Sequence, residues 1–560
     1  MGSLDEEVIH YNDWPNAQGF DVRYEERSPV ELSVSGNIPA YATGTLFRTG
    51  LGPRKLQTDA GTTFRVNHWF DGFAQVHRFQ IHAPAPGEPS VRVTYNSRSS
   101  CDAVLERIKR AGKDEGFTFG AKYDLCTSYF QKLQSFFRPA PKPRGADSLN
   151  MSVTLSANFP GLNTNGDRLN EAPERDKIVS LCNKTDISSF QMLDPQTLEP
   201  IGLAQQKSLH PSLKGPSSAT HAKSDPVTGD VYNYNLEYGR TGKYRVFTVS
   251  ASTGQTSILA TFSADASYLH SLFLTEHYVI ICVWNAFFSL GGAPIFYHMN
   301  IVDALAEYDG TRPATWYVVD RQPVEAGGKG LIATYDSDPF FAFHTINAYE
   351  EAGSQANQVD IIADIICYDN HDCIKRFYLD NIVSDSPTAK GFSDGAFARC
   401  GASIRRFRLP DVPSKPIDQR FKADTVFVKA RDFYVELPAI NPRRLMRKYR
   451  YIYGMIDTGK STFFDGLVKY DIETHKDIRW SYHGQTAGEP IFVADPESED
   501  EDGGVLLSVV LDGVEGKSYL LVLDAKTMKE VGRASVDGVV GFGFHGTHVP
   551  AGRDEVALQI

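Results

Sequence analysis

Four histidines share a sequence setting that suits a metal site. His221 lies in SATHAKSDPVTG, His270 in ASYLHSLFLTEHYVI, His344 in PFFAFHTINAYEE and His545 in GFGFHGTHVP. Their separations are 49, 74 and 201 residues, so no local metal-binding motif links them. Each stands at the edge of a predicted strand, and four imidazoles brought together from such positions would suit iron, copper or zinc. Taken singly, each is more often a buried structural histidine, so the prediction depends on all four meeting.

Two glutamates stand where a buried carboxylate would need a partner. Glu436 lies in FYVELPAINP and Glu489 in TAGEPIFVADP, among apolar residues, prolines and glycines. An unpaired carboxylate is expensive to bury. A metal-ligating imidazole commonly donates its second ring N–H to a carboxylate, which fixes the tautomer and the ring orientation. We therefore expect these glutamates behind ligand histidines, the alternative being surface glutamates at strand ends.

Short apolar runs separated by turn residues predict the elements that must bring these side chains together. Runs such as VRVTYNSRS, DVYNYNLEYG, YVIICVWN and GVLLSVVLDG are typical of strands. An Asp or Ser followed by Thr and a polar turn fits hairpin tips, and it recurs with Thr197, Thr228, Thr253, Thr474 and Thr527. Such recurrence without regular helices favours an all-β radial array, a β-propeller, as a single domain over residues 1–560.

One segment departs from this pattern. Between Ser99 and Phe137 the apolar residues recur every three to four positions, which predicts a short helical insertion or cap.

Composition and charge argue against nucleic-acid binding and against secretion. The net charge of −12 and the pI near 5.7 argue against a nucleic-acid surface, which needs clustered Lys and Arg. The seven cysteines form no CxxC pair, and the acidic N-terminus lacks the apolar core of a secretory signal, so we expect a cytoplasmic protein. The longest apolar stretch, from Val279 to Leu290, is too short to span a bilayer, so any membrane contact should be peripheral.

Taken together, the segments resemble the carotenoid cleavage oxygenase family. The resemblance runs from Gly44 to Pro550 and rests on HWFDGFAQVHRFQI, SATHAKSDPVTGDVYNY, SYLHSLFLTEHYVI, FHTINAYEE, VELPAINP, GEPIFVADPESEDEDGGVLLSVVLDG and the terminal FHG. It implies a seven-bladed β-propeller that holds one Fe(II) per chain on its axis.

By position, the resemblance assigns the iron to His221, His270, His344 and His545, which form the catalytic centre, and the outer carboxylates to Glu436 and Glu489. A third outer glutamate is expected near LCNKTDISSF, where Lys184 and Asp186 stand instead. Either the shorter carboxylate of Asp186 takes its place or that contact is missing. The remaining nearby histidines are assigned to structure: His68, His77, His277 and His548.

The resemblance also implies a reaction with O2 as co-substrate, in which both oxygen atoms are inserted across one double bond to give two carbonyl products. Our first expectation is cleavage of a carotenoid or apocarotenoid to an apocarotenal or retinal. The second is cleavage of a stilbene or phenylpropene such as resveratrol or isoeugenol, with Lys184 contacting the substrate phenol. Ester-cleaving isomerisation ranks third. An alternative from a different functional class is a non-catalytic propeller that serves as a scaffold or binds a ligand.

An apolar polyene needs an aromatic-lined path. Phe287, Phe288, Phe340 and Phe341 flank the histidine strands and are predicted to line it, the alternative being core packing. The segment Tyr123 to Phe137 aligns with the membrane-touching loop of animal members of the family. We expect it either to contact a membrane or lipid body peripherally or to pack on the propeller.

Overall fold

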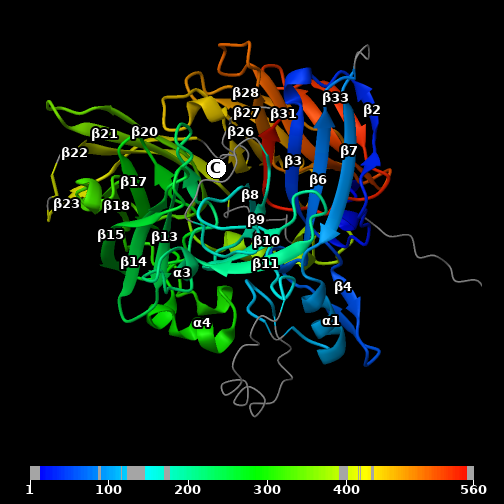
Figure 1. Cartoon of the computed structure of the whole chain (residues 1–560), viewed down its shortest axis with the longest axis horizontal. Helices are drawn as coiled ribbons and strands as arrows, with labels where there is room; N and C mark the ends of the chain where they lie inside the picture. The colour runs from blue at the N-terminus through cyan, green and yellow to red at the C-terminus, as the bar shows by residue number, and fades with distance from the viewer. Residues whose placement is uncertain are drawn as a thin grey trace, which may run out of the picture.

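The chain folds as a seven-bladed β-propeller, as expected. The computed structural model describes residues 13–85, 90–114, 116–122, 145–169, 177–389, 401–413, 415–416, 418–429 and 434–551. Seven sheets of four to six strands make up the blades, and a separate two-stranded ribbon, β4 (Lys55–Gln57) and β5 (Thr63–Arg65), lies outside them. Figure 1 shows the sheets arranged around a common centre. The predicted single domain over residues 1–560 stays a prediction.

The first three blades follow the chain from its N-terminal third. Blade 1 contains β1 (Val30–Glu31), β7 (Arg92–Ser99), β6 (Ala74–His82), β3 (Gly44–Leu51) and β34 (Gly546–Pro550). Blade 2 contains β8 (Thr154–Ala157), β9 (Leu181–Lys184), β10 (Ser189–Leu193) and β11 (Pro200–Gln205). Blade 3 contains β12 (Lys223–Ser224), β13 (Val231–Glu237), β14 (Gly242–Val249) and β15 (Thr256–Ala264).

The other four blades complete the ring. Blade 4 contains β16 (Phe273–Leu274), β17 (Tyr278–Val283), β18 (Ala314–Asp320), β19 (Leu331–Ser337) and the parallel β23 (Arg420–Lys422). Blade 5 contains β20 (Phe341–Ala352), β21 (Val359–Tyr368), β22 (Ser403–Val412) and β24 (Asp424–Val428). Blade 6 contains β25 (Tyr434–Ala439), β26 (Tyr451–Asp457), β27 (Gly466–Asp471) and β28 (Asp477–Trp480). Blade 7 contains β29 (Gln485–Ala487), β30 (Ile491–Ala494), β31 (Gly504–Asp512), β32 (Lys517–Asp524), β33 (Glu530–Ser535) and β2 (Ser33–Gly36).

Strands from both ends of the chain close the ring. β34 pairs with β3 in blade 1, and β2 pairs with β33 in blade 7. In Figure 1 the blue N-terminal strands therefore lie beside the orange and red C-terminal ones. One end strand of each blade faces the centre, and neighbouring inner strands such as β34 and β8, or β16 and β20, contact one another. The inner strands therefore bring residues from distant parts of the sequence to one axis.

The predicted turns are hairpin tips. The Asp194 carboxylate accepts the Thr197 N–H between β10 and β11, and the Asp524 carboxylate accepts the Thr527 N–H between β32 and β33. A carboxylate that caps its own turn in this way explains the recurrence of this pair in the sequence.

The helices are short. The α-helices are α1 (Asp102–Ala111), α3 (Gln206–Leu209), α4 (Ala293–His298), α5 (Cys373–Arg376) and α6 (Leu379–Ile382). The 3-10 helices are η2 (Ala17–Phe20), η3 (Ala40–Ala42), η4 (Trp69–Asp71), η5 (Ser289–Gly292), η6 (Val302–Ala304), η7 (Val324–Ala326) and η9 (Pro442–Arg444).

The predicted helical insertion is confirmed over α1 only. Val104 and Ile108, four residues apart, are buried, and Gly112 ends the helix in the left-handed conformation. The predicted membrane segment Tyr123 to Phe137 lies outside the described residues. Within the part of the chain that is described, no helix is long and apolar enough to cross a bilayer.

Candidate metal centre

The four predicted histidines meet on the axis, each from the inner strand of a different blade. His221 and His270 lie just before β12 and β16, His344 lies within β20, and His545 lies directly before β34. One ring nitrogen from each histidine lies within 4.8 Å of the others. All four side chains are buried.

The shortest approaches are between Nε2 atoms. Nε2 of His545 lies 2.9 Å from Nε2 of His221 and 3.2 Å from Nε2 of His344. The ring centroids of His270 and His344 are 5.2 Å apart.

A carboxylate holds the Nδ1 atom of three of these histidines. Nδ1 of His344 lies 2.6 Å from Oε2 of Glu436, which belongs to β25. Nδ1 of His545 lies 2.7 Å from Oε1 of Glu489, which lies between β29 and β30. The two glutamates occupy the positions that we expected for them.

Asp186 provides the third carboxylate. It lies in the loop between β9 and β10, and its Oδ1 and Oδ2 are 2.8 Å and 2.9 Å from Nδ1 of His270. Of the two possibilities left open for this position, the structure shows the shorter carboxylate in contact with the imidazole.

Burial disfavours the charged form of two of the imidazoles. Removal from water, reinforced by the neighbouring imidazoles, lowers the pKa of His221 and of His545 well below the usual value. Burial opposes ionisation of Glu436, but His344 and the Tyr368 hydroxyl hold the pKa of this carboxyl below its usual value. Burial raises the pKa of Glu489 to about 7, against the opposing effect of Arg48.

The donor set fits a divalent transition metal. Because Glu436 and Glu489 accept the Nδ1 protons of His344 and His545, the Nε2 atoms of both rings carry lone pairs. These Nε2 atoms are only 3.2 Å apart, and two lone pairs so close repel unless a cation lies between them. Neutral imidazole is a good ligand for iron, copper and zinc.

An aromatic cavity of about 180 Å3 opens on one side of the four histidines. His270, His344 and His545 are among its lining residues. Aromatic side chains dominate its wall: Trp69, Phe70, Phe117, Phe119, Tyr268, Phe343, Phe377, Phe464 and Phe544. Such a wall suits an elongated apolar ligand.

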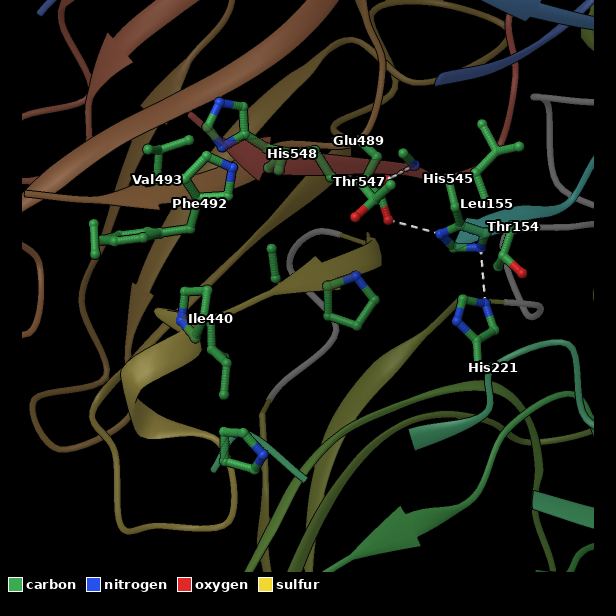
Figure 2. Close-up of a pocket in the computed structure, with 18 of the residues that line it drawn as sticks. Thr154, Leu155, His221, Ile440, Glu489, Phe492, Val493, His545, Thr547 and His548 are labelled. Carbon is green, nitrogen blue, oxygen red and sulfur yellow. Dashed lines mark hydrogen bonds and ion pairs between the residues drawn. The ribbon is translucent and has the colours of Figure 1, made fainter. Parts of the chain in front are cut away.

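A lysine-lined cavity of about 530 Å3 lies on another side of the group and shares His344 and His545 with the aromatic cavity. Figure 2 shows His221 and His545 facing one another in its wall, with Glu489 behind His545. Lys184 and Lys223 line this cavity, and burial lowers the pKa of each to about 8.

The predicted substrate residues lie elsewhere. Phe340 is fully buried and stacks on Phe407, and Phe341 packs edge-on against Phe343. Phe288 packs against Tyr238, and Phe287 lies under the Arg312 guanidinium. Neither cavity is lined by any of the four predicted phenylalanines, so their alternative assignment to packing describes them better. Lys184 lines the lysine-lined cavity instead of the aromatic one.

The four histidines assigned to structure are not in the group. His68 contacts the Ile374 carbonyl and His77 the Tyr95 hydroxyl. His277 pairs with Glu350 near the surface, and His548 contacts the Ala42 carbonyl.

The phenylalanines that do line the aromatic cavity could have been found beside the histidines in the sequence. Phe343 and Phe544 directly precede His344 and His545. Regular strand alternation would send Phe343 and His344 to opposite faces, but β20 shifts register between Ala342 and Asn347. This irregularity turns both side chains toward the centre.

Comparison with known proteins identifies the family to which this chain belongs. The family described as retinal pigment epithelial membrane protein matches residues 19–550. The carotenoid dioxygenase of Neurospora crassa is 42% identical, with 97% of this chain and 92% of that protein covered. The torulene dioxygenase of Fusarium fujikuroi is 39% identical, with 97% and 94% covered. The β,β-carotene 15,15'-dioxygenase of Mus musculus is 27% identical, with 94% and 90% covered.

Solved structures agree on the fold. A variant of the Synechocystis apocarotenoid oxygenase superposes with a TM-score of 0.71 at 19% identity, covering 97% of this chain and 100% of that one. A cobalt-substituted form of the Synechocystis enzyme gives a TM-score of 0.71 at 20% identity, again covering 97% and 100%. The match across residues 19–550 and the identities to the two fungal enzymes together establish that the chain belongs to the retinal pigment epithelial membrane protein family of carotenoid oxygenases.

Proposed function

We propose that the protein is a non-haem Fe(II) dioxygenase that cleaves a carbon–carbon double bond of a carotenoid or apocarotenoid to give two carbonyl products. His221, His270, His344 and His545 hold the iron. The observation that carries this proposal is the meeting of four buried imidazoles, three of which (His270, His344 and His545) line an aromatic cavity. The similar fungal dioxygenases support it.

The reaction requires a redox-active metal such as iron. Activation of O2 for attack on a closed-shell alkene requires a metal that supplies electrons, which zinc cannot do. When bound, iron supplies that chemistry, with O2 as co-substrate. Asp186, Glu436 and Glu489 each accept an Nδ1 proton and leave Nε2 of their imidazole for the metal.

The aromatic cavity binds the substrate and orients it. Phe70, Phe343 and Phe377 hold a flat polyene by ring contact and keep water from its double bonds. Because these groups are apolar, they orient the chain by shape and not by hydrogen bonds. Because His270, His344 and His545 line the same cavity, a double bond of the bound chain lies beside them.

The position of Lys184 favours a carotenoid over a stilbene. A lysine that contacts a substrate phenol should line the same cavity as the aromatic side chains. Lys184 instead lines the other cavity, together with Lys223.

Membrane contact at the mouth of the aromatic cavity would admit such a substrate. Phe117 lines this cavity and is 40% exposed, while Leu290 in η5 and Phe296 in α4 are 85% and 66% exposed. A bridge between Thr118 and Asn300 connects these segments, and α1 and α4 lie at the lower edge of Figure 1. Peripheral insertion of these apolar side chains would place the protein on membranes or lipid bodies.

Substitution of the ligands tests the proposal. His270→Ala and His344→Ala should each lose most of the bound iron and all turnover while circular dichroism stays unchanged. His277→Ala is the control, because the His277 side chain is 65% exposed and pairs with Glu350 away from the four-histidine group. Iron content, and aldehydes formed from β-carotene, torulene, an apocarotenal, resveratrol and isoeugenol, are measured by mass spectrometry. Iron-free folded wild-type protein would favour a non-catalytic scaffold, and turnover of resveratrol alone would overturn the substrate class.

A further inference from the structure

Each carboxylate behind the histidines is held by a further donor. The Tyr268 hydroxyl donates to Oδ2 of Asp186 at 2.8 Å. The Tyr368 hydroxyl donates to Oε1 of Glu436 at 2.5 Å, and Arg48 donates to Oε2 of Glu489 at 3.1 Å. Two phenols and one guanidinium therefore form a layer outside the carboxylates.

The backbone donor to Asp186 is more distant than the backbone donors to the two glutamates. Besides Tyr268, Asp186 accepts the Thr220 N–H at 3.3 Å. Glu436 accepts the Leu437 N–H at 3.0 Å, and Glu489 accepts the Gly546 N–H at 2.8 Å. Asp186 is also one methylene shorter than a glutamate and lies in a loop, so its orientation depends more on a side-chain donor.

We propose that Tyr268 is a positioning residue for the metal centre: its hydroxyl orients Asp186, and Asp186 orients His270. The inference rests on the four-histidine centre proposed above and not on the identity of the substrate. The phenol oxygen is 2.8 Å from Oδ2 of Asp186 and 3.2 Å from Nδ1 of His270. Since Asp186 also contacts Nδ1 of His270, each of the three groups contacts the other two. Loss of the hydroxyl leaves the carboxylate free to turn away from Nδ1.

The tyrosine itself is firmly placed. Its N–H donates to the Ala286 carbonyl at 2.8 Å, and its carbonyl accepts the Trp284 indole N–H at 3.0 Å. Its ring packs against Phe119 at 5.5 Å in the wall of the aromatic cavity. Tyr268→Phe therefore keeps the ring contacts and removes only the oxygen.

Release of metal measures the effect without turnover. The full-length protein is loaded with cobalt(II), and the loss of its visible absorption is followed after addition of a chelator. Tyr268→Phe should release cobalt about 10- to 100-fold faster than wild type, as expected when an outer contact of a ligand histidine is lost. Tyr335→Phe is the matched control, because its buried ring also carries a hydroxyl that donates to a backbone carbonyl, that of Pro410 at 2.9 Å, and its release rate should stay within about 2-fold of wild type.

A double-mutant cycle shows whether Tyr268 acts through Asp186. Asp186→Asn alone should speed cobalt release, and adding Tyr268→Phe to it should give little further change, because both act on the same contact. With iron bound, Tyr268→Phe should lower kcat and leave KM within about 2-fold, since the cavity wall is preserved. Equal release rates for Tyr268→Phe and Tyr335→Phe, or fully additive effects in the cycle, overturn the inference. Wild-type protein that retains neither cobalt nor iron overturns the proposed metal centre instead.

Discussion

Single polar side chains decide whether the centre of this propeller is a metal site. Three carboxylates, from Asp186, Glu436 and Glu489, would be costly to bury alone, and each is paired with an imidazole. Removal of one imidazole therefore leaves a buried charge without its partner. For this reason a histidine variant at the centre should be compared with wild type for both stability and metal content.

The buried His68 should make the fold sensitive to acid. Burial lowers the pKa of His68 to about 4, and its two ring nitrogens contact the Ile374 carbonyl and the Phe70 N–H. The unfolded chain, with a pKa near 6.5, binds a proton first as the pH falls, so this histidine should cost the fold about 2 kcal/mol of stability between pH 7 and pH 5.

Urea unfolding of metal-free protein at both pH values measures this cost. His68→Gln should be less stable than wild type at pH 7, because its contacts change, yet should lose about 2 kcal/mol less on going to pH 5. Asn381→Ala, which removes no titratable group, should lose as much as wild type. An identical loss for all three proteins would show that His68 does not titrate in this way.

Sequence reasoning at this scale succeeded for motifs and failed for packing. The histidines and both glutamates stood in segments that resemble a known family. Arg48 and Tyr268 were missed, because a guanidinium or phenol that holds a carboxylate has no periodic pattern. Phe340 and Phe341 were assigned to the cavity because they are near His344 in sequence, but the register of β20 sends Phe343 there instead.

At the scale of elements, close backbone contact explains how His545 reaches the axis. The segment before β34 lies against β3: Thr49 Oγ1 accepts the N–H groups of Phe544 and His545, at 3.1 and 3.2 Å. A Cβ atom on Gly543 would lie 1.8 Å from the Thr49 carbonyl oxygen, so any side chain there must push the segment outward.

Gly543→Ala should therefore displace His545 and lower the metal content. We expect a loss of about 1–3 kcal/mol of stability, the usual cost of overpacking, together with faster metal release. Gly310→Ala is the control, because a Cβ atom there would meet only Tyr308 at an ordinary 3.8 Å. Metal analysis and thermal unfolding measure both effects. A Gly543→Ala protein that holds metal as tightly as the control would contradict this account.

The sequence predicts the long outer strands and the hairpin tips better than the short inner strands. Apolar alternation marks the long strands, and capped turns mark the hairpin tips. The inner strands β12 and β16 have only two paired residues each, which is too short for a periodic signal. Their place on the axis is set by contacts with other blades, which no local pattern contains.

At the scale of the whole molecule, the N-terminal segment joins α6 to the loop between β26 and β27. Asn16 is fully buried; its side-chain NH2 donates to the Ile382 carbonyl and the Thr462 hydroxyl, and its Oδ1 accepts the Ser384 N–H at 2.8 Å. These contacts join residues that are more than 360 positions apart in the sequence.

Asn16→Ala should lower the midpoint of thermal unfolding. It leaves buried polar groups without a partner at a cost of about 1–3 kcal/mol each. Asn381→Ala, which removes a hydrogen bond at the surface, should change the midpoint much less. Calorimetry of the metal-loaded proteins measures both. Equal midpoints would show that this segment does not hold the ring together.

Every blade contributes one residue to the centre: His545, Asp186, His221, His270, His344, Glu436 and Glu489 come from blades 1 to 7 in that order. Because these residues come from all seven sheets, a chain in which the ring has not closed cannot bring the whole set together. Metal ligation by such a set is coupled to folding. Retained metal therefore reports that the ring is closed.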